Sequence, residues 1–280
     1  MIVLPDSALD ALLAQDVPHG DLTTDSLGIG GRPATMRFAA RGAMVLAATE
    51  EAARLVEKAG GRILRFSPSG TGVEAGAVFL EADGPAGALH RAWKVAQTLV
   101  EYASGIATRA RRIVDAAPGV TVACTRKNFP GAKDISVKAV MAGGAVMHRM
   151  GLSETLLAFP EHRAFLSDPP ADWIAALRRK APEKKIVVEA GSVEEAVALA
   201  EAGADVIQLE KLPPEAARAV IEATRGLNPA PVVAPAGGVT EANAAAYAAA
   251  GCRLLVTSAP YFGQPADVKV TLQPARQYPS

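Results

Sequence analysis

Two pairs of basic residues mark where chemistry is expected in this chain. Arg126-Lys127 follows the apolar run GVTVAC, and His148-Arg149 lies a short distance further on. The 280 residues carry 29 Lys and Arg against 29 Asp and Glu, so this local positive charge does not come from a basic composition. Grouped cations of this kind are typical of phosphate and carboxylate binding. We therefore expect a small phosphorylated substrate with several negative charges.

Two acidic residues stand where apolar strands are expected to end. Glu189 closes the run KKIVVEA and Glu210 closes ADVIQLE, and helix-forming sequence follows each run. In a βα barrel the active site lies at the carboxyl ends of the strands. We therefore expect both carboxylates and Arg126-Lys127 at the same mouth.

A glycine pair and a serine end the next two strands. Gly237-Gly238 closes APVVAPAGG, and Ser258 closes CRLLVTS. Glycines let backbone N–H groups approach an anion closely, and a helix N-terminus, expected near Thr240, favours negative charge. This turn is therefore a candidate phosphate site.

Each of these residues also has a purely structural interpretation. A strand-end Glu often caps a helix or forms a surface ion pair, and a Gly-Gly pair is often only a turn. Cys124 fits a small buried residue, and His148-Arg149 fits a solvated pair. The basic residues of the long helix fit solvated positions: Lys94, Arg109, Arg111 and Arg112. The placement of several such groups on one expected face favours the functional interpretation.

The elements that position these groups fall into two patterns. Up to about residue 103, short strands broken by glycine turns surround one amphipathic helix, Thr49–Ala59, which predicts a small α+β domain. A long helix, Ala88–Ala117, follows and stops at Pro118-Gly119. Beyond Val120, apolar strands alternate with single helices, which is typical of a parallel sheet.

The helix after KKIVVEA carries clear end signals. Ser192 and Glu195 have the spacing of a capping box, and Gly203 stands where the helix is expected to end. No GxGxxG follows the first strand, so the pattern favours a βα barrel over a dinucleotide-binding sheet. We expect an α/β protein with an N-terminal α+β sandwich (1–103) and a C-terminal open barrel of parallel strands (104–267). The tail, 268–280, is expected to pack back on the first domain.

Composition excludes several other classes. A neutral net charge argues against nucleic acid as a partner, and two cysteines argue for a reducing cytoplasm rather than a disulfide scaffold. The acidic start is unlike a secretory signal, and the most apolar window is interrupted by Arg253, so no membrane association is expected. The histidines His19, His90 and His162 lack partners at metal-ligand spacing, so zinc is not expected.

Six motifs occur in the order found in one enzyme family. They are GDLTT (20–24), SGIAT (104–108), TRKNFPG (125–131), GGAVMHRMGL (143–152), EAGAD (201–205) and GGVT (237–240). The chain thus resembles the nicotinate-nucleotide pyrophosphorylases, or quinolinate phosphoribosyltransferases, from about residue 16 to 270. EYASGIATR and HRMGLSETLLAFPEHR resemble the branch called ModD, encoded with molybdenum transport genes. The resemblance implies a sandwich domain, an open α/β barrel, and a homodimer with active sites near the subunit interface.

The family reaction joins quinolinate to phosphoribosyl pyrophosphate (PRPP) and releases pyrophosphate and carbon dioxide to give nicotinate mononucleotide. The resemblance implies that Mg²⁺ accompanies PRPP and that Glu189 and Glu210, the latter in place of the family's Asp, approach ribose hydroxyls and metal. It implies a 5′-phosphate contact at Gly237. It also implies that four basic residues hold the anionic ring and phosphates, with Lys127 among the catalytic groups: Arg126, Lys127, His148 and Arg149.

Several positions depart from the family pattern. Tyr102 stands in place of an Arg that reaches the partner's quinolinate, and Phe159 in place of a Lys. Ala236 and Ser258 replace a Ser and a Gly of the phosphate site, where backbone N–H donors are retained. The family's lysine after TRK aligns with Val137, and Lys138 is one place along, about 100° around a helix. Two lost cations predict a flatter, less positive pocket and an acceptor that need not be quinolinate.

Two other functions fit the same residues. The first is the ordinary family reaction, with Arg109 or another cation replacing what Tyr102 and Phe159 lost. The second is a non-catalytic protein that binds phosphate or an oxyanion such as molybdate. The pair Glu189 and Glu210 argues against the second, because two carboxylates repel a bare dianion.

Overall fold

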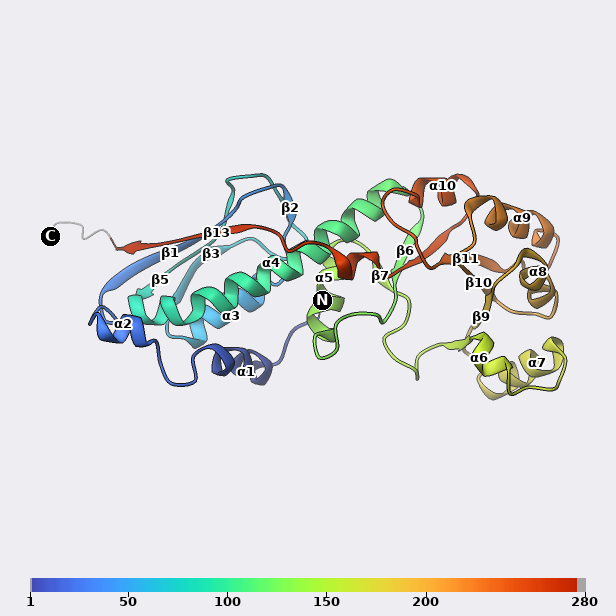
Figure 1. Ribbon diagram of the computed structural model, residues 1–280, viewed down its shortest axis with the longest axis horizontal. Coiled ribbons are helices and arrows are strands. Elements are labelled where there is room, and N and C mark those ends of the chain that lie inside the picture. The colour runs from blue at the N-terminus through green and yellow to red at the C-terminus, as the bar shows by residue number, and fades with distance from the viewer. Residues whose placement is uncertain (1, 276–280) are drawn as a thin grey trace. The chain divides into compact units, whose positions relative to one another are not determined.

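The chain forms two compact units in the computed structural model, which describes residues 2–275 (Figure 1). The first unit contains the residues up to Arg109, the segment Phe129–Gly144 and the residues from Tyr261 onward. The second contains Ala110–Asn128 and Ala145–Pro260. The segment that links the two basic pairs therefore belongs to the first unit.

A four-stranded antiparallel sheet in the order β13-β1-β5-β3 is the centre of the first unit. On β1, Met36 and Phe38 face inward and alternate with more exposed residues, as the period of two in a strand requires. Helices α3 and α4 cover this face, with Leu55 and Leu89 in the same buried cluster. The expected sandwich domain is confirmed.

The helices and strands that belong to this part of the chain are α1 (Asp6–Asp16), α2 (Leu22–Ser26), β1 (Pro33–Ala40), β2 (Met44–Val45), α3 (Thr49–Lys58), β3 (Arg62–Phe66), β4 (Gly72–Val73), β5 (Val78–Pro85), α4 (Ala86–Ala116), α5 (Lys133–Ala142), the 3₁₀ helix η1 (Ala259–Phe262) and β13 (Val268–Pro274). Strand β13, red in Figure 1, comes from the tail and pairs with the blue strand β1. Helix α4 runs past Arg109 into the second unit, and η1 begins there.

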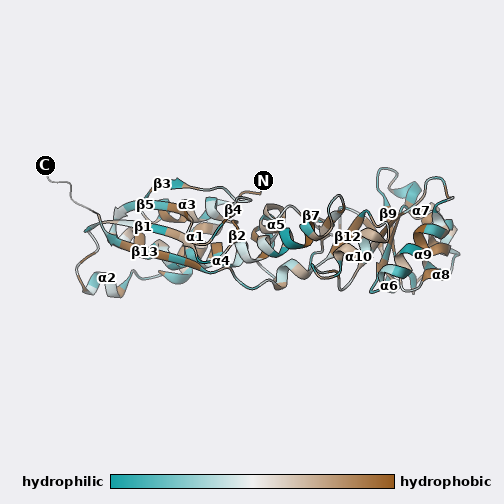
Figure 2. Cartoon of the chain, turned by 90° about the horizontal axis from the view of Figure 1, so that it is seen from above, coloured by the Kyte–Doolittle hydropathy of each residue, from teal (hydrophilic) through white to brown (hydrophobic). Residues whose placement is uncertain are grey.

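Seven parallel strands in the order β7-β6-β12-β11-β10-β9-β8 form the second unit. Strands β7 and β8 lie at opposite edges, so the sheet is an open barrel, as expected. Its elements are β6 (Thr121–Cys124), β7 (Val146–Met147), β8 (Leu156–Ala158), α6 (Pro160–Arg163), α7 (Pro170–Lys180), β9 (Ile186–Ala190), α8 (Val193–Glu201), β10 (Val206–Glu210), α9 (Pro214–Thr224), β11 (Val232–Ala236), α10 (Ala244–Ala249) and β12 (Leu254–Thr257). Figure 2 shows strand β9 in the brown of apolar residues, in keeping with burial on both faces.

Alternation along the strands gives the barrel a distinct inner face. Val187, Val206, Ala234 and Val256 form one buried apolar cluster together with Leu157. Because successive side chains point to opposite faces, the residues two places further along each strand lie on this face too, nearer the carboxyl ends. Glu189 lies two places beyond Val187, and Glu210 lies four places beyond Val206, one level nearer the carboxyl end.

One expected helix start is wrong. Helix α10 begins at Ala244 rather than near Thr240. The Asn243 side chain accepts a hydrogen bond from the Thr240 N–H at 2.8 Å and donates one to the Gly238 carbonyl at 2.9 Å. The N–H of Thr240 is thereby occupied, so the predicted helix N-terminus beside the glycines is absent.

The signals on the helix after β9 are confirmed with one change. The Ser192 hydroxyl accepts from the Glu195 N–H at 3.1 Å, and Gly203 adopts a φ of 99° just beyond the helix. The Glu195 carboxylate, however, accepts from the Gly191 N–H at 2.8 Å and pairs with Arg163. The cap is therefore made by Ser192 alone.

Lys138 lies in the first unit and is only 2% exposed. Its ammonium lies 2.6 Å from a carboxylate oxygen of Glu51, which is fully buried, and 2.9 Å from Glu50. Ser69 completes this group by donating its N–H and hydroxyl to Glu50. We name these four residues the lysine cluster.

Helix α4, the longest of the described helices, is too polar to cross a membrane, and none of the others combines the length and apolar character needed.

Candidate functional site

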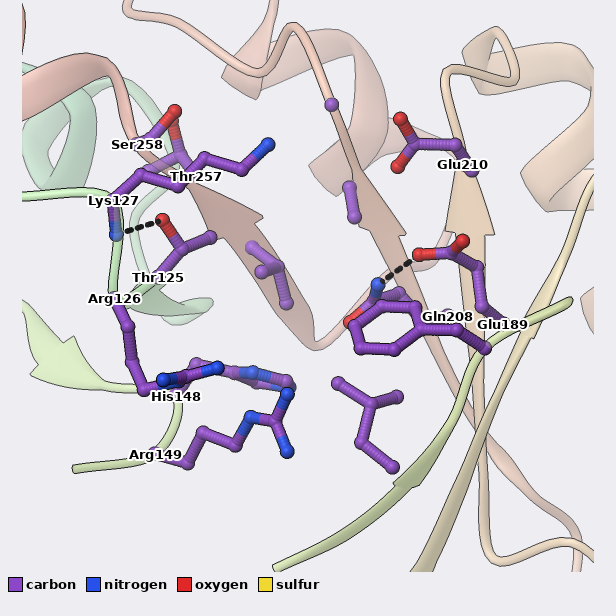
Figure 3. Close-up of a pocket in the computed structure, with 15 residues that line it drawn as sticks. Thr125, Arg126, Lys127, His148, Arg149, Glu189, Gln208, Glu210, Thr257 and Ser258 are labelled. Atoms are coloured by element: carbon purple, nitrogen blue, oxygen red, sulfur yellow. Dashed lines mark hydrogen bonds between the residues drawn. The ribbon is translucent and has the colours of Figure 1, made fainter. Parts of the chain in front are cut away.

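A pocket opens at the carboxyl ends of the barrel strands, and every residue that lines it belongs to the second unit. Figure 3 shows two walls that face each other across it. The lining residues are Thr125, Arg126, Lys127, His148, Arg149, Leu157, Phe159, Glu189, Gln208, Glu210, Ala236, Gly237, Val256, Thr257 and Ser258.

The first wall is basic and comes from the segments that follow β6 and β7. Arg126 and Lys127 are exposed, whereas Arg149 is only 7% exposed. The His148 N–H donates to the Cys124 carbonyl at 2.8 Å, which ties the second basic pair to strand β6. Both basic pairs therefore reach the same wall because their strands are neighbours (Figure 3).

Burial and mutual repulsion shape the charge of this wall. Burial lowers the pKa of Arg149, and nearby Arg126 lowers it further. Burial also lowers the pKa of His148, with Arg149 adding to the effect. The imidazole is therefore neutral at pH 7, and the positive charge comes from the Arg and Lys side chains. An anion in the pocket relieves the repulsion between them.

The opposite wall is acidic and comes from β9 and β10. Glu189 and Gln208 are register partners on these strands, and the Gln208 amide donates to the Glu189 carboxylate at 2.7 Å. Burial raises the pKa of Glu189; the Gln208 hydrogen bond lowers it, whereas the negative charge of Glu210 raises it. Glu189 consequently takes up a proton more readily than an exposed glutamate.

A glycine turn borders the acidic wall. Gly237 and Gly238 have φ values of 76° and 90°, a region that other residues rarely adopt. A Cβ at Gly237 would lie 3.0 Å from a Glu210 carboxylate oxygen and 2.8 Å from the side chain of Lys211. The Lys211 ammonium lies 3.3 Å from the Glu210 carboxylate oxygen Oε1. The left-handed backbone and the close approach of the Lys211 side chain favour glycine at 237, and a larger residue would displace the Glu210 carboxylate.

Phe159 supplies an aromatic surface between the two walls. Its ring packs on the inner apolar face of the barrel and stacks on His162, with centroids 5.7 Å apart. The His162 Nδ1 accepts the Phe159 N–H at 3.0 Å, which fixes this arrangement. The Arg149 guanidinium lies 5.7 Å from the ring centroid, within cation–π range.

The structure brings together most of the residues that the sequence singled out. Those in the pocket are Arg126, Lys127, His148, Arg149, Phe159, Glu189, Glu210, Gly237 and Ser258. Gly238 adjoins the pocket without lining it. Tyr102 lies on α4 of the first unit, where it is 62% exposed, so its expected contact with substrate stays a prediction.

Cys124 is fully buried, and burial raises its pKa to about 12. Both facts agree with its interpretation as a small structural residue. Other lining residues were missed by sequence reasoning, chiefly Gln208, Thr125 and Thr257. A signal for Gln208 exists, because it is the one polar residue inside the apolar run VIQLE and lies two places before Glu210. Two places along a strand is the same face.

Comparison with known proteins matches two family domains that meet near residue 105. Residues 21–104 match the family described as "Quinolinate phosphoribosyl transferase, N-terminal domain", and residues 106–271 match its C-terminal domain. The "Putative pyrophosphorylase ModD" of Rhodobacter capsulatus is 50% identical over 252 residues, which cover 88% of this chain and 96% of that protein. The "Nicotinate-nucleotide pyrophosphorylase [carboxylating]" of Mycobacterium leprae (strain TN) is 30% identical, covering 91% and 93%.

Solved structures share the fold along the whole length. NadC from Streptococcus pyogenes has a TM-score of 0.89 at 23% identity and covers 99% of this chain and 100% of that one. The nicotinate-nucleotide pyrophosphorylase from Francisella tularensis has a TM-score of 0.88 at 21% identity, covering 97% and 98%.

Proposed function

The chain belongs to the quinolinate phosphoribosyl transferase family, and on that premise we propose that it transfers phosphoribosyl from PRPP to a nitrogen heterocycle and releases pyrophosphate. The observation that carries this proposal is the pocket with a basic wall and an acidic wall (Figure 3). PRPP offers phosphates to the first and ribose hydroxyls to the second. A ligand with phosphates alone would have no use for Glu189 and Glu210.

The reaction is a displacement at C1 of the ribose. A ring nitrogen forms a bond to C1 while the bond from C1 to the pyrophosphate oxygen breaks, and pyrophosphate leaves with the electron pair. Positive charge develops on the ribose and negative charge on the leaving group. Arg126 and Lys127, which stand together on the basic wall, stabilise the negative charge of the leaving group. Glu189, when ionised, accepts hydrogen bonds from ribose hydroxyls.

The residues present fit a magnesium ion that arrives with PRPP. Among the residues that the structure describes, no three or more His, Cys, Asp or Glu side chains are grouped around one metal position. Mg²⁺ is usually held by one or two carboxylates together with substrate phosphates, and Glu189 and Glu210 provide the carboxylates. When bound, the ion neutralises part of the pyrophosphate charge.

The acceptor is proposed to be less charged than quinolinate. Phe159 stands where the resemblance implies a cation, and its ring faces the pocket beside Arg149. A planar ring with one anionic group can stack on Phe159 while Arg149 pairs with that group. The proposal includes a homodimer, as the resemblance implies, and a cytoplasmic location, as the two cysteines indicate.

The test measures pyrophosphate release from PRPP and Mg²⁺ with quinolinate, nicotinate and a panel of neutral nitrogen heterocycles. Release with a ring other than quinolinate is expected. Release with quinolinate alone, together with carbon dioxide, would return the protein to the ordinary family reaction. No release with any ring would overturn the proposal.

The second candidate is a non-catalytic oxyanion-binding protein linked to molybdate transport, and the buried Arg149 beside Arg126 favours it. Calorimetry with molybdate and with PRPP separates the two candidates. Molybdate binding without any pyrophosphate release supports the binding protein. PRPP binding that is strengthened by Mg²⁺ supports the transferase.

A further inference from the structure

Gln208 lines the pocket and has a buried hydrogen-bonding atom that no described residue uses. The side chain is only 5% exposed and lines the pocket. Its amide nitrogen donates to Glu189, but its carbonyl oxygen Oε1 is buried and accepts no hydrogen bond from any described residue. A buried carbonyl of this kind is uncommon, since nearly all buried polar groups are paired.

The orientation of the Gln208 amide follows from its neighbour. An ionised carboxylate is an acceptor only, so the amide nitrogen must face Glu189 and Oε1 must face elsewhere. On the other side, the register partner on β11 is Ala234, whose methyl group has nothing to donate. Neither neighbouring strand therefore supplies a donor for Oε1.

The depth of Gln208 indicates which part of the ligand meets it. Gln208 lies two residues before Glu210 on β10, one level further from the carboxyl end of the strand. Phe159 continues β8 to the same level, Leu157 lies one level deeper, and both line the pocket. An aromatic and apolar surface beside the Gln208 acceptor suits a flat ring, while the neighbouring Glu189 remains for the ribose hydroxyls.

We propose that Gln208 selects the acceptor by accepting a hydrogen bond from an N–H donor on its ring. This inference rests on the proposed transferase function and names the class of acceptor. The acceptor is a nitrogen heterocycle that carries an amino, amide or ring N–H group in addition to an anionic group for Arg149. Quinolinate, fully ionised at neutral pH, has no donor to offer.

The test uses acceptors that differ in one donor only. Nicotinates with an amino group at each free ring position are compared with the matching methyl compounds, which have nearly the same shape and no donor. With PRPP and Mg²⁺, at least one amino compound is expected to exceed its methyl partner by about tenfold in kcat/KM, the effect of one hydrogen bond. For Gln208→Leu the two compounds are expected to agree within about twofold, a ratio that is measured within one variant and so does not depend on the hydrogen bond to Glu189 that the substitution also removes.

Gln15→Leu, at an exposed position of α1, is the matched control and is expected to behave as the wild type. If Gln208→Leu does not fold, Gln208→Met is used, because the methionine side chain is longer than that of leucine, is unbranched and has a volume similar to that of glutamine. Where no compound is turned over, the same comparison is made on Kd values by calorimetry in the presence of PRPP.

The outcomes separate this inference from the proposed function. Pyrophosphate release with equal rates for every amino and methyl pair overturns the role of Gln208 and leaves the transferase intact. A preference for the amino compound that Gln208→Leu retains also overturns it, because the donor then pairs with a residue other than Gln208. Absence of release with every ring overturns the transferase, and the Kd comparison then decides the role of Gln208.

Discussion

Two groups of polar and charged side chains, one in each unit, differ in how fully their members satisfy one another. In the lysine cluster, Lys138, Glu51, Glu50 and Ser69 satisfy one another inside the first unit. In the pocket of the second unit, Gln208 keeps an unused acceptor, and the basic and acidic walls stay apart. The first group therefore contributes to the fold, and the second is arranged for a ligand.

The comparison predicts that the lysine cluster matters most for stability. Lys138→Met leaves the buried carboxylate of Glu51 and the partly buried carboxylate of Glu50 without their cation, and is expected to lower the free energy of unfolding by about 3–5 kcal/mol. Urea unfolding measures this, with Lys133→Met as the control, an exposed position on the same helix. Equal stability of the two variants would show that the cluster is not structural.

The pocket predicts the reverse, a loss of activity without a loss of stability. Glu189→Gln is expected to lower kcat/KM for pyrophosphate release about 100-fold, the size expected for a residue that stabilises developing charge.

Because the folded chain raises the pKa of Glu189, ionisation costs stability as the pH rises through that pKa. The variant should thus be as stable as the wild type at pH 8, or more so. Glu201→Gln, exposed on α8, is the control, and a destabilised Glu189→Gln would contradict the comparison.

The glycine turn predicts a smaller effect on both properties. Gly237→Ala and Gly238→Ala each force a left-handed backbone, at a cost of about 1–2 kcal/mol. Only at 237 does the new methyl group meet Glu210, since nothing lies within 4 Å at 238. Gly237→Ala should therefore raise the KM for PRPP about tenfold more than Gly238→Ala. Equal KM values would mean that the position of Glu210 does not matter for PRPP.

The smallest predicted effect is a shift in pH dependence. If ionised Glu189 is needed, kcat/KM should rise with pH through a pKa above 4.5, the ordinary value for a glutamate. Gln208→Leu removes the hydrogen bond that lowers this pKa and should move the rise to higher pH. The profile of kcat/KM against pH measures both effects. If Gln208→Leu leaves this profile unchanged, Glu189 is not the group whose ionisation it reports.

The sequence predicted the site residues that stand at the ends of strands. Glu189, Glu210 and Arg126 were found because each follows an apolar run, and the rule that barrel sites lie at strand ends places them together. Gln208 was missed because only the ends of the runs were considered, and the alternation within VIQLE was not. A polar residue on the inner face of an otherwise apolar strand is the physical signal that identifies it.

Contacts between distant segments could not be predicted in this way. Lys138 is 87 residues from Glu51 in the sequence, and the local pattern around either residue does not predict that they pair. The helix start at Thr240 was wrong because the Asn243 side chain occupies the Thr240 N–H in a turn. Local side-chain bonds to the backbone compete with a helix, and which of them wins depends on the surrounding loop.

The excursion of Phe129–Gly144 into the first unit has a consequence for dissecting the molecule. The chain passes between the units after Arg109, Asn128, Gly144 and Pro260, so neither unit is one continuous segment. A truncation near residue 104 would remove α3 with Glu51 and leave α5 without its partner. A protease that nicks one crossing would leave three covalent connections in place. Gene fragments meant to produce either half alone would therefore need rejoined ends, because no single cut yields an intact unit.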